Sequence, residues 1–219
     1  MNSRFVTPLA LFVALGSASA VSAQSPAAAP AKASAYRVFN LGTVGNEARY
    51  RVSEELASIG YNEVVGKTKD VKGRIVVDAN GAVVKDSSKI IVNAQTLQTD
   101  SKRRDEKLKT QTLETDKFPQ VTLVPVSWEG FTPDIPAGQE KTFSMVGDLT
   151  VRNVTKPTTW QVTARKQGND IVGTAKTVFT LQYFNMEKPR AVMVMTVGDT
   201  VHLEYDFHFT PGAASAAAK

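Results

Sequence analysis

The 219-residue sequence contains no cysteine, and this absence excludes several kinds of chemistry at once. Without a thiol the chain can form no disulfide, no thiolate metal site and no cysteine nucleophile. It also lacks the acylated cysteine that anchors a bacterial lipoprotein. The fold must therefore be held together by the burial of apolar side chains, and a chain of this length is long enough to bury one core.

Histidine is nearly as scarce, because only His202 and His208 occur. Both fall on one face of a single predicted strand, roughly 20 Å apart at about 3.3 Å per residue, which is too far to ligate one metal ion. We interpret them as polar residues of a solvated face. The sequence has no P-loop, dinucleotide fingerprint or HExxH motif. We therefore expect no catalytic residue, no metal site and no cofactor, with paired carboxylates as the enzymatic alternative left open.

Charge of one sign does not dominate any part of the chain. The 26 basic and 21 acidic residues give a net charge of +5 and are interspersed along the sequence. A nucleic-acid-binding protein would cluster its basic residues on one face. We expect no nucleic-acid partner.

A long apolar run occurs only near the N-terminus. Arg4 precedes the run "LALFVAL", and the small residues "VSA" end at Ala23. This order is typical of a secretory signal peptide, and the run is too short to cross a bilayer core of about 30 Å. We predict a signal peptide over residues 1–23, with cleavage after Ala20 as the near alternative. The chain would then be periplasmic or secreted, without stable insertion in a membrane.

The remainder divides into one domain with low-complexity ends. Residues 24–35 ("QSPAAAPAKASA") and 211–219 ("PGAASAAAK") contain nothing large to bury, so we predict a disordered linker and a disordered tail. Residues 36–210 form a single predicted domain.

Alternation of apolar and polar residues predicts strands through this domain. In "TVHLEYDFHFT" the odd-numbered residues from Val201 to Phe209 are apolar and share one face. Asn80-Gly81 predicts a type I′ turn, and "QGND" at 167–170 a second hairpin. Closely spaced strands of this kind favour an antiparallel sandwich or barrel, and a closed barrel has no exposed edge. Further segments that alternate or are rich in strand-forming residues are 48–52, 64–78, 89–95, 121–128, 141–151, 158–166 and 173–183.

Two segments have helical signals instead. "SEELASIG" begins with Ser53 as an N-cap and ends at Gly60. "KRRDEKLKTQTLETDKFP" begins at Lys102, can be capped by a residue of 99–101, and carries Asp105 and Lys109 at i,i+4 spacing. Such a charged helix is usually a solvated surface element.

The inward faces of the strands are rich in aromatic residues and methionine. A closed sheet of eight strands has an interior that side chains can fill or that can hold one small apolar ligand, and periodicity does not separate these alternatives. Methionine suits an adaptable apolar lining. The predicted lining residues are Tyr50, Phe118, Leu123, Phe143, Met145, Phe179, Leu181, Met186, Met193 and Met195.

Four blocks of the sequence resemble, in order and spacing, those of the YceI-like family of exported bacterial proteins. They are "VVGKTKDVKGRIVVDANG", "SKIIVNAQTLQTDSKRRDEKLKTQTLETDKFPQVTLVP", "GDLTVRNVTKPTTWQVTA" and "FNMEKP…VGDTVHLEYDF", within residues 34–209. The resemblance implies an all-β, lipocalin-like, eight-stranded antiparallel barrel with one or two short helices. It also implies an apolar cavity for a polyisoprenoid such as an isoprenoid quinone or a prenyl phosphate.

The resemblance also assigns roles to the charged segment. Arg104 and Asp105 would order it, and Leu108 and Phe118 would plug the barrel. Arg103, Arg104 and Lys107 are the predicted contacts of an anionic head group. The chain departs from the family at Asn153 and Asn185, where glycine is common, and asparagine tolerates the left-handed backbone conformation best among the other residues.

These observations predict a periplasmic carrier that binds an amphipathic polyisoprenoid lipid. The alternative is a stress-response or protein-interaction module that uses the barrel as a scaffold. The sequence does not name the lipid, and it leaves open whether the chain forms a homodimer.

Overall fold

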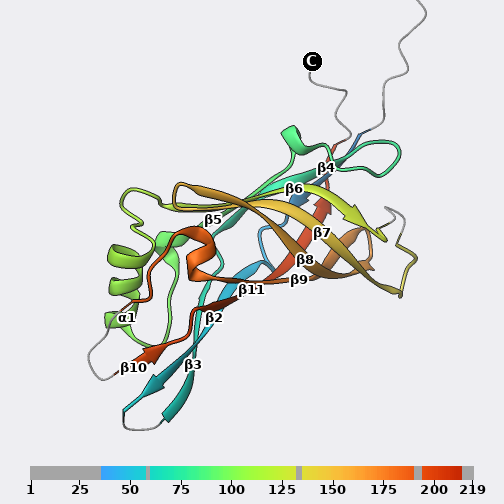
Figure 1. Ribbon diagram of the computed structural model, residues 1–219. Coiled ribbons are helices and arrows are strands. Elements are labelled where there is room, and N and C mark those ends of the chain that lie inside the picture. The colour runs from blue at the N-terminus through green and yellow to red at the C-terminus, as the bar shows by residue number, and fades with distance from the viewer. Residues whose placement is uncertain (1–35, 58–59, 132–134, 190–193, 214–219) are drawn as a thin grey trace, which may run out of the picture. The chain divides into compact units, whose positions relative to one another are not determined.

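The computed structural model describes residues 36–57, 60–131, 135–189 and 194–213. Eight strands within these residues form a closed antiparallel barrel (Figure 1). In ring order they are β1 (Arg37–Leu41), β4 (Val71–Val77), β5 (Lys89–Asn93), β6 (Gln120–Glu129), β7 (Glu140–Val151), β8 (Val154–Gln167), β9 (Asp170–Thr180) and β11 (Thr200–Pro211), which pairs with β1 again. The predicted fold class is confirmed.

Three further strands extend one end of the ring. β2 (Glu47–Leu56) continues from β1 along β11, β3 (Gly60–Thr68) pairs with β2, and β10 (Val194–Val197) pairs with the far part of β2. The helix α1 (Lys102–Lys107) lies at the same end as the β2–β3 hairpin and β10 (Figure 1). It continues into a π-helical turn, η3 (Leu108–Thr112). Short 3-10 turns are η1 (Lys85–Ser87), η2 (Ala94–Thr96) and η4 (Leu181–Phe184).

The helix predicted at Ser53–Gly60 is wrong. Ser53 to Leu56 belong to β2 and pair with Glu63 to Gly60 of β3, so this segment is a hairpin. Cross-strand pairing outweighs the local capping signals because it places Glu54 inside and Glu55 outside, as strand alternation requires. The segment predicted as one strand at 64–78 is also divided, by a turn in which Thr68 Oγ1 accepts a hydrogen bond from Asp70 N at 3.1 Å.

The predicted turns occur, but their backbone differs in detail. At the Asn80-Gly81 turn only Gly81 has a positive φ (85°), and the Asp78 carboxylate holds the loop by accepting from Asn80 N and Ala82 N. The type I′ assignment is therefore wrong, although the chain does reverse between Val77 and Val83. "QGND" connects β8 to β9 as predicted.

The end of the barrel away from α1 is packed solid. Trp128, Phe131 and Phe143 form an aromatic cluster with ring centroids 4.4 to 6.2 Å apart. Phe207 and Phe209 alternate with polar residues along β11, and both are buried on its inner face with their ring centroids 5.4 Å apart. This half supplies the close-packed core that a fold without disulfides needs.

Candidate functional site: an apolar cavity beside helix α1

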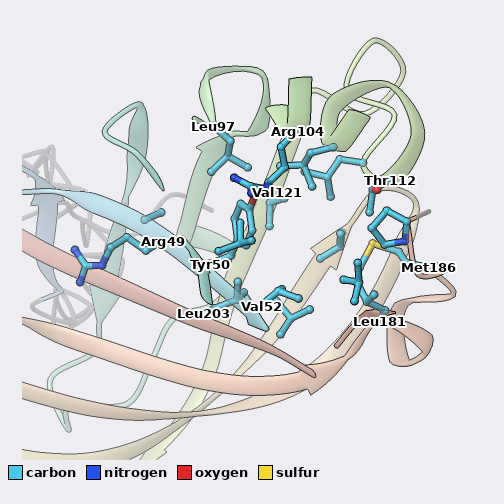
Figure 2. A pocket seen from close by; sticks show the side chains of 18 of the residues that line it. Arg49, Tyr50, Val52, Leu97, Arg104, Thr112, Val121, Leu181, Met186 and Leu203 are labelled. Carbon is cyan, nitrogen blue, oxygen red and sulfur yellow. The ribbon is translucent and has the colours of Figure 1, made fainter. Parts of the chain in front are cut away.

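The other half of the barrel contains a partly open cavity of about 340 Å³ (Figure 2). This volume is in the range of small-molecule sites in proteins. Inner residues of the ring strands form one wall, β2 and β3 a second, and the α1–η3 segment a third. Apolar lining residues include Val52, Val64, Ile90, Val92, Leu97, Leu113, Val121, Leu149, Val151, Trp160, Val201 and Leu203.

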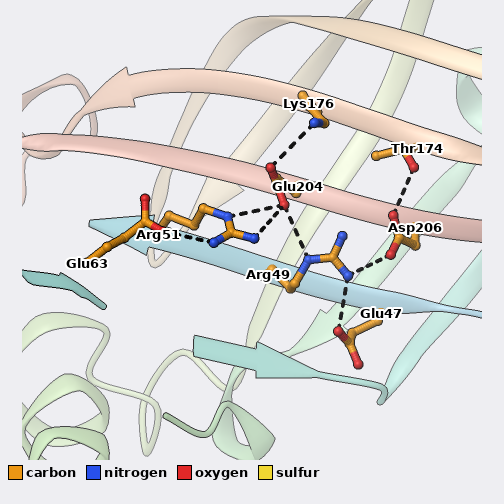
Figure 3. Close-up of polar contacts among 8 residues, drawn as sticks. All are labelled: Glu47, Arg49, Arg51, Glu63, Thr174, Lys176, Glu204 and Asp206. Atoms are coloured by element: carbon orange, nitrogen blue, oxygen red, sulfur yellow. Dashed lines mark hydrogen bonds and ion pairs between the residues drawn. The ribbon is translucent and has the colours of Figure 1, made fainter. Parts of the chain in front are cut away.

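Strand β2 supplies its wall through simple alternation. Tyr50 and Val52 point inward (Figure 2), and so does Glu54, which is buried and lines the cavity. Arg49 and Arg51 form ion pairs on the opposite face (Figure 3). Burial raises the pKa of the Tyr50 phenol, so it remains protonated at every physiological pH. The wall is therefore apolar at Val52 and polar at Tyr50 and Glu54, the inward-facing residues before and after it.

The outer face of this wall carries a network of charges on four strands, β2, β3, β9 and β11 (Figure 3). Arg49 Nη1 lies 2.6 Å from Asp206 Oδ2 and 3.1 Å from Glu47 Oε1. Glu204 accepts from Arg49 and Arg51, with Lys176 Nζ 3.6 Å away. The network joins β2 to β11 and β9 and so stiffens the wall behind the cavity.

The α1 segment is fixed by its own sequence at the cavity edge. Ser101 caps the helix, accepting from Arg104 N at 3.4 Å. The Asp105 carboxylate accepts from the backbone N (2.8 Å) and Oγ1 (2.7 Å) of Thr99, and these bonds replace the predicted pair with Lys109. The helix predicted here is confirmed.

The three predicted head-group residues do come together, because Arg103, Arg104 and Lys107 all line the cavity. The side chains of Arg103 and Arg104 differ in their hydrogen-bond and ion-pair partners. Arg104 forms ion pairs with Glu54 and Asp100, whereas Arg103 is exposed and has no hydrogen bond or ion pair with any residue that the structure describes. Their binding of a head group stays a prediction.

Half of the predicted lining residues line this cavity. They are Tyr50, Leu123, Phe179, Leu181 and Met186. Met193 lies outside the described residues. Whether the five bind a ligand stays a prediction.

The other four predicted lining residues lie elsewhere. Phe143 and Met145 point inward but into the packed half, where aromatic neighbours fill the space. Phe118 lies under the guanidinium of Arg152, 5.9 Å from its ring centroid. Met195 is on the outer face of β10 and is 69% exposed.

Several residues on the cavity wall were not predicted. Trp160, Val201 and Leu203 could have been found from strand alternation, but alternation does not say which part of an inner face stays unfilled. Glu54 was missed because its segment was assigned to a helix. Among the described residues no group of three or more histidine or acidic side chains could hold a metal ion. Nor does any helix in the described part of the chain have the length and apolarity needed to span a membrane.

The strand order and the cavity together define a class of protein: a closed antiparallel barrel with a packed core at one end and an apolar cavity at the other. The model of the YceI-like domain matches residues 43–209, and the chain belongs to this family. A UPF0312 protein of Yersinia enterocolitica is 27% identical over 133 residues, covering 56% of this chain and 65% of that protein. Protein YceI of Escherichia coli is 28% identical over 120 residues, covering 54% of this chain and 58% of that protein. The chain thus spans somewhat less than two thirds of the length of these two relatives.

Solved structures share the fold. A polyisoprenoid binding domain from Saccharophagus degradans, described as implicated in plant cell wall breakdown, superposes with a TM-score of 0.58 at 10% identity, covering 82% of this chain and 99% of that one. BcnA of Burkholderia cenocepacia gives a TM-score of 0.58 at 15% identity, with 77% and 98% covered. At these identities the likeness concerns the fold alone.

Proposed function

We propose that this protein is a carrier that encloses the apolar chain of a polyisoprenoid lipid in the cavity of its barrel. The observation that carries the proposal is the cavity itself. Aromatic side chains fill the packed end of the barrel, but about 340 Å³ beside α1 is not filled by side chains. Burying an apolar chain gains about 0.8 kcal/mol per CH₂ group, so several isoprene units would bind without covalent chemistry. The structural neighbour described as a polyisoprenoid binding domain supports the same ligand class.

The first experiment is organic extraction of the protein purified from its native host, followed by mass spectrometry. We expect a co-purifying lipid with a repeating isoprenoid chain. An extract without lipid, combined with no uptake of a fluorescent prenyl probe by the delipidated protein, would contradict the proposal.

A pair of variants on one strand tests whether the cavity is the site. Leu203 of β11 points into the cavity (Figure 2), whereas its neighbour His202 is exposed and does not line the cavity. Leu203→Trp should fill the space and weaken probe binding by about tenfold or more, whereas His202→Trp should leave it unchanged. Equal binding by both variants would place the ligand elsewhere.

We also propose that the carrier works outside the cytoplasm, on the strength of the signal-peptide pattern in residues 1–23. Intact-mass measurement of the protein expressed with its own N-terminus should give a chain that begins after Ala23, or after Ala20. An unprocessed chain in the cytoplasmic fraction would contradict this.

A further inference from the structure

A carboxylate is buried in the wall of this largely apolar cavity. Glu54 on β2 lines the cavity, and its side chain is only 6% exposed. Its Oε1 accepts hydrogen bonds from Nη2 of Arg104 at 3.0 Å and from Nδ2 of Asn62 at 2.8 Å. The Arg104 bond crosses from α1 to the β2–β3 hairpin and joins two walls of the cavity.

The positive charge of Arg104 is already balanced within the protein. Besides Glu54, its guanidinium forms an ion pair with Asp100 and donates a hydrogen bond to Thr99 Oγ1 at 3.4 Å. Two carboxylates thus share one guanidinium, and one of them faces the cavity. An anion that enters this part of the cavity would therefore meet a buried carboxylate as well as the guanidinium of Arg104.

The Tyr50 hydroxyl supplies an uncharged hydrogen-bonding group in the same region. It lies close to the Arg104 guanidinium (Figure 2). No residue that the structure describes forms a hydrogen bond with it. Because burial raises its pKa, the phenol keeps its proton and can donate to a carbonyl or hydroxyl oxygen.

We propose that Tyr50, Glu54 and Arg104 select lipids whose apolar chain ends in an uncharged hydrogen-bonding head, an alcohol or a ring carbonyl, over lipids that end in a phosphate. This inference rests on the proposed function. A neutral oxygen can bond to Tyr50 without disturbing the ion pair. A phosphate there would meet the Glu54 carboxylate at low dielectric, and like charges brought together in a desolvated site are strongly unfavourable.

Two further cations, Arg103 and Lys107, line the same cavity. Arg103 lies on the same wall but is exposed, so water and salt screen its charge. Lys107 follows one helical turn later and is half-buried. Arg103 and Lys107 can attract an anionic head group to the opening of the cavity. The Glu54 carboxylate repels the anion at the position where the head group would be buried together with its chain.

The test uses two ligands with one tail, all-trans geranylgeraniol and geranylgeranyl monophosphate. Their binding to the delipidated protein is measured by quenching of tryptophan fluorescence, since Trp160 lines the cavity. We expect the wild-type protein to bind the alcohol at least tenfold more tightly. Glu54→Gln keeps the shape and removes the charge, so it should improve binding of the phosphate about tenfold and change that of the alcohol less than threefold. Tyr50→Phe should weaken binding of the alcohol about fivefold and leave that of the phosphate unchanged.

Each outcome decides the inference. Tighter binding of the phosphate by the wild-type protein, or an unchanged ratio in a folded Glu54→Gln variant, would overturn the inference and leave the carrier proposal standing. Failure of both ligands to bind the wild-type protein would overturn the carrier proposal itself. If near-ultraviolet circular dichroism shows that Glu54→Gln does not fold, the wild-type ratio and Tyr50→Phe still decide.

Discussion

Gly66 of β3 lies against the ring of Tyr50, its cross-strand partner on β2. A Cβ atom at position 66 would lie 2.1 Å from Cε1 of Tyr50 and 2.7 Å from its Oη. The missing side chain therefore lets the tyrosine ring lie over β3. The shape of the cavity at its polar end depends on this glycine.

Gly66→Ala should push the Tyr50 ring out of its position. Overpacking of this kind costs about 1–3 kcal/mol, and we expect a loss of that size in the free energy of unfolding, measured by urea denaturation. Prenyl-probe binding should weaken with it. The matched control is the same substitution in a Tyr50→Ala background, where the methyl group meets no ring and should cost little. An equal cost in both backgrounds would show that the ring is not the cause.

The turn after η4 contains a residue with left-handed backbone. Asn185 has φ 54° and ψ 35°. Only glycine adopts this conformation at no cost, so Asn185→Gly should stabilise the protein slightly and Asn185→Ala should destabilise it by about 1 kcal/mol.

Asn153 provides the control for that prediction. It stands at the other position where the sequence suggested a left-handed residue, but the positive φ of that turn, 56°, belongs to Arg152. Asn153→Ala should therefore leave the urea midpoint nearly unchanged. A cost as large as that of Asn185→Ala would argue against the backbone explanation.

The strands that could be predicted from the sequence are those with one apolar and one polar face. β11 is the clearest case, because Val201, Tyr205, Phe207 and Phe209 are all buried as expected. β1 was not predicted, since it has only five residues and its alternation is too short to recognise. Its role in closing the ring depends on pairing with β4 and β11, which are distant in the sequence.

The site could be predicted only in part, because a cavity depends on where side chains are absent. Leu181 and Met145 look equivalent in sequence, yet the first borders the cavity and the second is in the packed half. The difference comes from Trp128, Phe131 and Phe143, which gather at one end of the barrel. Strand alternation gives the inner face of each strand but not the volume left between faces.

The hollow and the packed halves should respond differently to the same truncation. Val162 of β8 is 4% exposed in the packed core, and Val52 of β2 borders the cavity. Val162→Ala loses close contacts on every side and should cost about 2 kcal/mol of unfolding free energy. Val52→Ala loses fewer contacts, because one side of it already faces empty space, and should cost less than about 1 kcal/mol.

Lipid binding sharpens this comparison. If the cavity holds an apolar chain, the cost of Val52→Ala should rise when the prenyl probe is present, while that of Val162→Ala should not. Thermal unfolding with and without the probe measures both. Equal costs for the two variants in the empty protein would mean that the cavity is filled in solution.

The outer charge network should make the stability of the protein depend on acid pH. The hydrogen bond from Arg49 lowers the pKa of Asp206, and for Glu204 the raising effect of burial is outweighed by Arg51 and Arg49, so its pKa is lowered too. A carboxylate whose pKa is lower in the folded state stabilises the fold above its ordinary pKa, 3.8 for aspartate and 4.5 for glutamate, and loses this contribution as the pH falls further. The urea midpoint should therefore fall between pH 6 and pH 3.

Arg49→Met removes the cation that Asp206 and Glu204 share and should flatten this dependence. Because the groups are partly exposed, we expect the variant to be less stable than the wild-type protein by about 1 kcal/mol at pH 6 and to approach it at pH 3. Lys72→Met is the matched control: its side chain is 82% exposed and lies 4.0 Å from Asp70, so both pH values should give the wild-type midpoint. A constant difference between Arg49→Met and the wild-type protein across this range would show that the arginine acts through packing of its side chain and not through its charge.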